Sequence, residues 1–185
     1  MSQQGFTMEL YLDPALENQV LKAWNVLAQR QISTHLIEME SRPHITLFST
    51  PFLEPSKLDS LLKAFASKHD PLPLTFSSVT TFPNDSNNLL FLAPTPSLSL
   101  LHFQSQLCDA IRKKGIEIAD EYAFNSWIPY CSVAHHVPKN KMSEAFSLLR
   151  ELKLSVSSYV MDAALEQFSP IWEIFSFVLS NNLHS

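Results

Sequence analysis

The chain has 185 residues, 45% hydrophobic and 17% charged, which is typical of one globular domain or of two closely packed lobes spanning residues 1–185. Its net charge of −5, from 13 Lys and Arg against 18 Asp and Glu, argues against an extended face for duplex DNA. The apolar runs are far shorter than the ~20 residues of a membrane span, and the two glycines are too few for a P-loop or a GxGxxG motif.

The first half of the chain predicts the order strand, helix, strand, helix, strand. The expected elements are a strand at residues 7–12, a helix with the apolar face Leu16, Val20, Leu21, Trp24 and Leu27, a strand at residues 44–49, a helix at residues 56–68 and a strand at residues 74–82. A polar turn at residues 84–88 then predicts a hairpin loop.

The second half predicts the same order again. The expected elements are a strand at residues 89–93, a helix with Leu98, Leu100, Leu101 and Phe103 in its core, a strand at residues 130–135, a helix at residues 141–152 and an interrupted strand at residues 154–168. A further strand is expected at residues 175–179, and we expect residues 181–185 to be loose.

The two halves also match residue by residue. Aligning RPHITLF (residues 42–48) with IPYCSVA (residues 128–134) places prolines, hydroxyl residues and aliphatic residues opposite one another, and the same offset places Phe82 opposite Phe168. The duplication predicts an α+β fold with two pseudo-symmetric lobes, at residues 6–88 and 89–180. We expect each lobe to be a small antiparallel sheet with helices packed outside, and a central cleft to lie between the lobes.

Alternate residues of a strand point to one face, which pairs the polar side chains of each motif. His44 and Thr46 therefore point together, as do Tyr130 and Ser132. If the lobes are related by a pseudo-twofold axis, the two motif strands face each other across the cleft. An imidazole, a phenol and two hydroxyls would then surround one space, a set of groups that suits a phosphate.

PHITLF and PYCSVA resemble the two His-x-Thr/Ser motifs of the 2H phosphoesterase superfamily, with Trp127 and Ala134 also matching. The resemblance implies a phosphodiesterase that needs no metal and no cofactor. It implies that His44 is one acid–base residue and that Thr46 and Ser132 hold the phosphate. The implied substrates are 2′,3′-cyclic nucleotides, ADP-ribose 1″,2″-cyclic phosphate and RNA ends that carry a cyclic phosphate.

Tyr130 departs from the motif, because it occupies the position of the second catalytic histidine. A phenol with a pKa near 10 is neutral at pH 7 and is a poor base. Three interpretations are open: an inactivating change, natural or constructed, that leaves a binding cleft; a phenol that serves as an alternative acid or hydrogen-bond donor; or an incorrect register between the motifs. A non-catalytic module that binds a nucleotide or an RNA end is therefore the alternative function.

Four further residues are candidates for substrate binding. Phe82, Phe168 and Trp127 could stack on a base or ribose, since aromatic faces accept any nucleobase. Core packing is the competing interpretation for the two phenylalanines. Arg42 precedes the first motif and could steer the phosphate or simply be solvated.

The other histidines are not expected to belong to the site. If the second motif strand continues through His135 and His136, these side chains point in opposite directions and do not form one metal-binding face. His136 would then lie about 20 Å from Tyr130 and could not replace a missing imidazole. His35, His69, His102 and His184 have no partner pattern and are expected on the surface.

Two cysteines are too few for a disulfide scaffold or a cysteine zinc site, and the N-terminal residues show no secretory signal. We therefore expect a cytoplasmic protein, with the nucleus as a further location, and a monomer. The expected partner is a nucleotide cyclic phosphate or an RNA 3′ end.

Overall fold

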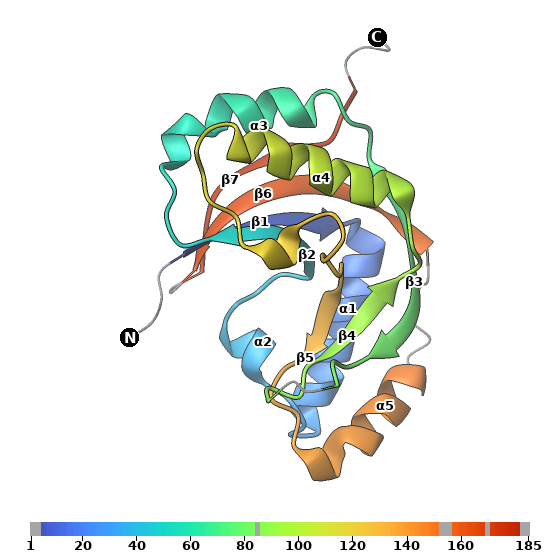
Figure 1. Ribbon diagram of the computed structural model, residues 1–185. Coiled ribbons are helices and arrows are strands. Elements are labelled where there is room, and N and C mark those ends of the chain that lie inside the picture. Colours follow the sequence, from blue (N-terminus) through green and yellow to red (C-terminus); the bar gives the residue numbers. More distant parts are fainter. Residues whose placement is uncertain (1–4, 84–85, 152–156, 169–170, 182–185) are drawn as a thin grey trace.

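The computed structural model describes residues 5–83, 86–151, 157–168 and 171–181. Within them the strands form one antiparallel sheet in the order β2-β1-β6-β3-β4-β5, with β7 paired to β6 (Figure 1). The expected antiparallel α+β fold is confirmed. The strands are β1 (Gly5–Leu12), β2 (His44–Thr50), β3 (Leu72–Thr80), β4 (Leu90–Pro94), β5 (Cys131–Ala134), β6 (Ser157–Phe168) and β7 (Trp172–Val178).

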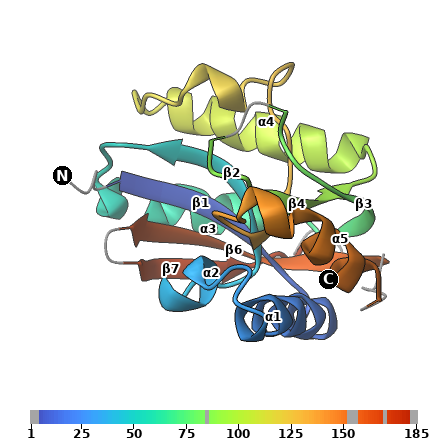
Figure 2. The same cartoon turned by 90° about the horizontal axis from the view of Figure 1, so that it is seen from below.

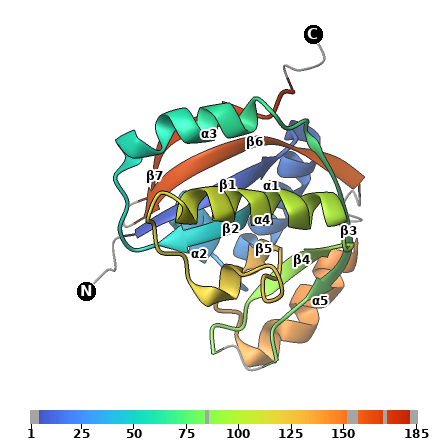
Figure 3. The ribbon, with the colours of Figure 1, turned by 45° about the horizontal axis from the view of Figure 1, so that its top comes forward.

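Helices cover the sheet on both sides. They are α1 (Pro14–Gln29), α2 (His35–Glu38), α3 (Asp59–Ala66), α4 (Leu98–Arg112) and α5 (Met142–Glu151), with 3-10 turns η1 (Pro55–Lys57), η2 (Asp120–Tyr122) and η3 (Lys139–Lys141). Seen from below, α4 and α1 lie on opposite sides of the strands (Figure 2). With the top turned forward, α3 lies along β6 and β7, while α4 crosses in front of β1 and β2 (Figure 3).

The first helix of each repeat begins with a side-chain oxygen that caps the helix N-terminus. Asp13 caps α1 by accepting a hydrogen bond from Leu16 N at 2.9 Å, and Pro14 occupies the first turn. Ser97 caps α4 by accepting from Leu100 N at 3.3 Å. Both helices bury one apolar face; in α1 it comprises Leu16, Val20, Ala23, Trp24 and Leu27.

The order β-α-β-α-β appears twice along the chain, and the first two strands of each repeat pair with each other, β1 with β2 and β4 with β5. β3 pairs with β4, and β6 pairs with β1, so the third strand of each repeat joins the first strand of the other. β3 and β6 also pair with each other. The third strands therefore connect the two expected lobes, since the β3–β4 pairing crosses residue 88 and β6 pairs with β1.

Several expected boundaries shift. The helix expected at residues 56–68 is shorter, since α3 covers only Asp59–Ala66 behind the η1 turn. The second motif strand ends at Ala134, and β6 is continuous from Ser157 with a register shift opposite Tyr11. Residues 84–85, 154–156 and 182–185, which include parts of the expected turn, strand and tail, lie outside the described residues.

Three side chains hold the two motif strands in place. The indole N–H of Trp127 donates to Thr46 O at 3.1 Å, and that of Trp24 donates to Ser132 O at 3.1 Å. On the covered side of β2, the Gln104 amide donates to Leu47 O at 3.0 Å. β2 and β5 lie at opposite ends of the strand order and yet contact each other, because the sheet curls.

None of the helices in the described ranges combines the length and the apolar character that crossing a membrane requires.

Candidate functional site

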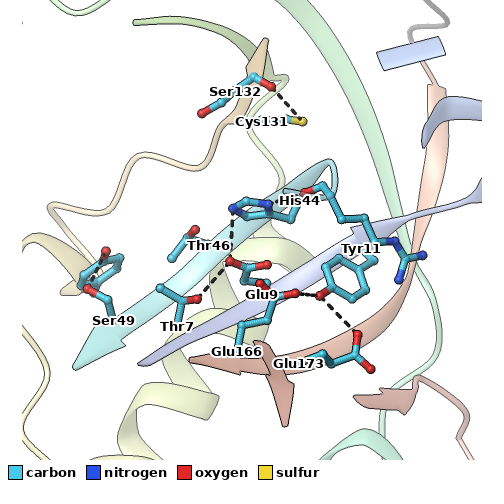
Figure 4. A network of polar contacts seen from close by, with 12 residues as sticks. Thr7, Glu9, Tyr11, His44, Thr46, Ser49, Cys131, Ser132, Glu166 and Glu173 are labelled. Carbon is cyan, nitrogen blue, oxygen red and sulfur yellow. Dashed lines mark hydrogen bonds and ion pairs between the residues drawn. The ribbon is translucent and has the colours of Figure 1, made fainter. Parts of the chain in front are cut away.

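The curled sheet leaves a hollow of about 240 Å³ between the motif strands, which we call the motif hollow. Five of the predicted site residues line it: His44, Thr46, Tyr130, Ser132 and Phe168. Thr7, Glu9 and Glu166, which the sequence did not single out, line it as well, and so does His135, which was expected to lie outside the site. In Figure 4, His44 and Thr46 lie between the acidic floor at Glu9 and the strand that carries Ser132.

Both ring nitrogens of His44 have partners. Nδ1 lies 2.5 Å from Arg42 O, and because a carbonyl can only accept, Nδ1 carries a proton. Nε2 lies 3.3 Å from Glu9 Oε1, and the two side chains are 23% and 6% exposed. Burial lowers the pKa of His44, while the Arg42 carbonyl and the charge of Glu166 act in the opposite direction.

The carboxyl group of Glu9 is buried beside that of Glu166, and these two acids form the floor of the motif hollow (Figure 4). Thr7 Oγ1 donates to Glu9 Oε1 at 3.0 Å, and Glu9 Oε2 has no hydrogen-bond partner among the described residues. Tyr11 OH donates to Glu166 Oε1 and lies 3.5 Å from Glu173 Oε2. Burial, followed by the neighbouring Glu166, raises the pKa of Glu9 well above its ordinary range.

These shifts indicate where the protons reside. A lowered pKa for His44 and a raised pKa for Glu9 both favour a neutral imidazole beside a neutral carboxyl group. In that state Glu9 donates to Nε2, which is the acceptor of an imidazole protonated at Nδ1. A protonated Glu9 also repels a phosphate in the motif hollow less than a carboxylate would.

Tyr130 lies immediately before β5, where the predicted equivalence with His44 would place it, and it lines the motif hollow. Its ring contacts two others: the centroids lie 4.9 Å from Phe91 and 5.6 Å from Phe82. Phe82 and Phe91 are themselves 4.6 Å apart. The phenol ring is therefore packed in an aromatic cluster at the edge of the motif hollow.

The remaining predicted binding residues differ in their access to the site. Phe168 lines the motif hollow and packs so closely on Gly5 that a Cβ there would overlap the Phe168 ring. Phe82 lines two adjoining hollows with Tyr130. Trp127 is buried, with its N–H bonded to Thr46 O, so its placement fits positioning of β2 better than stacking on a base.

Arg42 is placed away from the motif hollow. Its Nε lies 2.8 Å from Glu17 Oε2, and its guanidinium stacks 3.9 Å over the Tyr11 ring. Arg42 thus contributes its backbone carbonyl to His44 rather than its charge to the hollow.

The expectation that His136 lies about 20 Å from Tyr130 along an extended strand is wrong. β5 ends at Ala134, and His136 adopts a left-handed conformation with φ of 54°, so the chain turns there. As a result, His135 lines the motif hollow, and both histidines line an adjoining hollow with Tyr130.

Glu9 could have been found from the sequence, because a carboxylate within an apolar strand and in phase with Thr7 and Tyr11 indicates a polar strand face. Glu166 and His135 gave no comparable signal, since their proximity arises from the strand exchange and from the turn after β5.

Two other features of the described residues bear on the chemistry. A larger hollow of about 750 Å³, lined by residues of the β2–η1 and α4–η2 connections, shares no residue with the motif hollow and lacks its histidine–hydroxyl set. In the described ranges, no group of three or more His, Cys, Asp or Glu side chains is arranged to hold a metal ion.

Comparison with known proteins gives one family and several similar folds. The family model for the 2′-5′ RNA ligase superfamily matches residues 13–168. Among solved structures, one described as a phosphoesterase has a TM-score of 0.64 at 12% identity, covering 97% of this chain and 100% of its own. The protein TT0787 of Thermus thermophilus has a TM-score of 0.63 at 12% identity, covering 96% of this chain and 99% of its own.

A third similar structure is E. coli LigT complexed with 3′-AMP, with a TM-score of 0.62 at 11% identity, covering 96% of this chain and 98% of its own. At such identities these likenesses show the fold. Among curated proteins, none matches the chain.

Proposed function

Because the chain belongs to the 2′-5′ RNA ligase superfamily, the 2H phosphoesterases, we propose that it is a metal-independent phosphodiesterase for cyclic phosphates whose activity Tyr130 impairs. The proposed substrates are 2′,3′-cyclic nucleotides, ADP-ribose 1″,2″-cyclic phosphate or RNA ends with a cyclic phosphate. The observation that carries the proposal is the meeting of His44, Thr46 and Ser132 around one phosphate-sized hollow.

Each residue has a defined part in the proposed reaction. The hydroxyls of Thr46 and Ser132 donate to phosphate oxygens. Nε2 of His44 exchanges its contact with Glu9 for water and takes the proton as the water oxygen bonds to phosphorus. The bond from phosphorus to one ribose oxygen breaks, and that oxygen must gain a proton, for which the phenol of Tyr130 is a weak donor at neutral pH.

The alternative function is a module that binds a nucleotide or an RNA end without turnover. The same hollow and the same hydroxyls serve this function, and the poor acid–base properties of Tyr130 favour it. The nucleotide part of the proposal is supported by LigT, which is complexed with 3′-AMP, ATP and NADP+ in its solved structures. We further propose a monomer, cytoplasmic or also nuclear, that binds neither duplex DNA nor membranes.

A comparison of variants tests the proposal. Tyr130→His should raise kcat/KM for a 2′,3′-cyclic nucleotide by roughly 10²–10⁴-fold, the usual value of one positioned acid–base group. Phosphorus NMR follows the loss of the cyclic phosphate signal directly. The control Tyr130→Phe should remain at or below the starting activity, and His44→Ala in the Tyr130→His background should abolish the gain.

If Tyr130→His hydrolyses nothing but His44→Ala weakens nucleotide binding, the chain is a binding module. If neither change affects turnover or binding, the assignment of the motif hollow is wrong.

A further inference from the structure

Three histidine side chains from two distant segments gather beside the motif hollow. His35 begins α2, and its ring centroid lies 5.3 Å from that of His135 and 4.8 Å from that of His136. The rings of His135 and His136 are 6.2 Å apart. This histidine cluster is separate from His44, and the proposed reaction does not use it.

The backbone that carries the cluster is fixed on both sides. Ser33 Oγ accepts from His135 N at 3.0 Å and donates to His135 O at 2.7 Å. His136 N donates to Asn87 O at 2.7 Å, and His136 holds an uncommon left-handed conformation at φ 54°. Non-glycine residues in such conformations cost free energy and often occur at functional sites.

The cluster borders its own hollow of about 390 Å³, which we call the histidine hollow. Its other lining residues are Phe82, Asn87, Leu89 and Tyr130. Tyr130 and His135 line the motif hollow too, so the two spaces adjoin. Among the residues that the structure describes, no carboxylate lines the histidine hollow, whereas Glu9 and Glu166 line the motif hollow.

This composition selects for an anion. Imidazole rings offer N–H groups that can donate hydrogen bonds to phosphate oxygens. A metal ion is the usual alternative ligand of three histidines, but these rings are not arranged to hold one in the described structure. Tyr130 lines both spaces and contacts Phe82, which lines the histidine hollow, so the apolar faces of a nucleoside could pack there.

We propose that His35, His135 and His136 form a second phosphate subsite beside the motif hollow, so that the preferred ligand carries one phosphate in addition to the reacting one. The inference rests on the proposed function of the motif hollow. The additional phosphate is either the 5′-phosphate of a mononucleotide or the preceding phosphodiester of an RNA 3′ end. Both ligands present an anionic phosphate at the same distance along the sugar, but only the RNA end carries a further nucleoside beyond it.

Binding of three product-like probes tests the subsite without requiring turnover. Calorimetry compares adenosine 2′-monophosphate, adenosine 2′,5′-bisphosphate and a dinucleotide that ends in a 2′-phosphate. In the unaltered chain, the additional phosphate should strengthen binding by about 10-fold or more, the value of one or two charge-assisted hydrogen bonds. A gain with the bisphosphate alone identifies a mononucleotide ligand, and a gain with the dinucleotide identifies an RNA end.

Variants then show which residues provide the gain in affinity from the additional phosphate. His35→Asn and His136→Asn should remove most of the gain and leave the affinity for adenosine 2′-monophosphate within about 2-fold. The matched control His102→Asn should retain the gain, because His102 stacks on Phe124 and lines neither hollow. Thermal denaturation of each variant confirms that it is folded.

The proposal is overturned if the additional phosphate gives no gain in the unaltered chain, or if the two variants keep it. It is also overturned if EDTA removes the gain and zinc restores it, which would make the cluster a metal site. A 5′-phosphate gain without hydrolysis by Tyr130→His would contradict the proposed enzyme activity and leave the subsite standing.

Discussion

Glu9 is a buried acid whose ionisation bears on both the stability of the fold and the charge of the motif hollow. Its carboxyl group is buried beside Glu166 and 3.3 Å from His44 Nε2. Because its pKa in the folded chain lies above the ordinary value of 4.5, the folded state holds this proton more tightly than the unfolded state. The stability that this proton contributes is complete below pH 4.5 and is lost as the pH rises through the folded-state pKa.

Glu9→Gln should therefore stabilise the protein at high pH. A glutamine amide nitrogen in the place of Oε1 can donate one N–H to His44 Nε2 and the other to the Thr7 hydroxyl oxygen, and it cannot ionise. We expect the Tm of Glu9→Gln, relative to the unaltered chain, to increase from pH 5 to pH 8. The increase should be ~2–4 °C for each kcal/mol that the ionisation of buried Glu9 costs the unaltered chain. Differential scanning calorimetry at both pH values measures it. An equal loss of Tm at both pH values would mean that Glu9 is ionised and stabilising in the fold.

Thr46 and Ser132 make a second prediction at the scale of single residues. Each hydroxyl lines the motif hollow from one motif strand, so each should donate one hydrogen bond to a bound phosphate. Thr46→Val and Ser132→Ala should each weaken binding of a nucleoside 2′-monophosphate by roughly 10- to 100-fold, from a charge-assisted bond of about 1.5–3 kcal/mol. Ser49→Ala is the matched control, because Ser49 lies on β2 but hydrogen-bonds Tyr122 at 3.1 Å.

At the scale of elements, two tryptophans fix the positions of the motif strands β2 and β5. Each strand pairs with only one neighbour in the sheet, so we expect the indole hydrogen bonds to be needed as well. Trp24 of α1 donates to Ser132 O, and Trp127 donates to Thr46 O, both at 3.1 Å. Each indole thus fixes the backbone of a residue, Ser132 or Thr46, whose hydroxyl would donate to a bound phosphate. Trp24→Phe and Trp127→Phe should each cost about 1–3 kcal/mol of stability, because a half-buried carbonyl loses its donor.

The same two variants should also weaken phosphate binding by ~3-fold or more, although neither side chain would donate to the ligand. Leu62→Ala in α3 is the control, since it removes buried apolar surface remote from the motif strands at a cost of about 2–5 kcal/mol. Urea titrations give the stabilities, and calorimetry gives the affinities. An unchanged affinity in both tryptophan variants would show that strand pairing suffices to place the hydroxyls.

The elements also show what the sequence could predict. Periodicity located α1 and α4, and the duplicated motifs located His44, Thr46, Tyr130 and Ser132, because these features depend on neighbours along the chain. The end of β5 at Ala134 was missed, since it depends on a backbone bond from His136 to Asn87, 49 residues earlier in the chain. Glu166 was missed because its contact with Tyr11 arises from β6–β1 pairing across nearly the whole chain.

At the scale of the whole molecule, the exchange of third strands makes the two repeats interdependent. β6 pairs with β1, β3 and β7, so it joins strands from both repeats. A chain ending at residue 88 would leave β1 without β6 and β3 without β4, exposing apolar faces and unpaired backbone groups on both. The motif strands would then lose their placement, because β2 pairs with β1 and β5 pairs with β4.

This interdependence predicts a single cooperative unfolding transition for the intact chain. It also predicts that fragments 1–88 and 89–185 are each unfolded alone and regain native-like structure only when mixed. Far-UV circular dichroism and proton–nitrogen NMR spectra of the fragments, separately and at equal concentration, measure this. A mixture of 1–88 with a 89–185 fragment carrying Ala164→Pro, in the part of β6 that pairs with β1, is the control and should remain unfolded. Dispersed spectra from either fragment alone would show that one repeat holds a core of its own, and two calorimetric transitions in the intact chain would carry the same meaning.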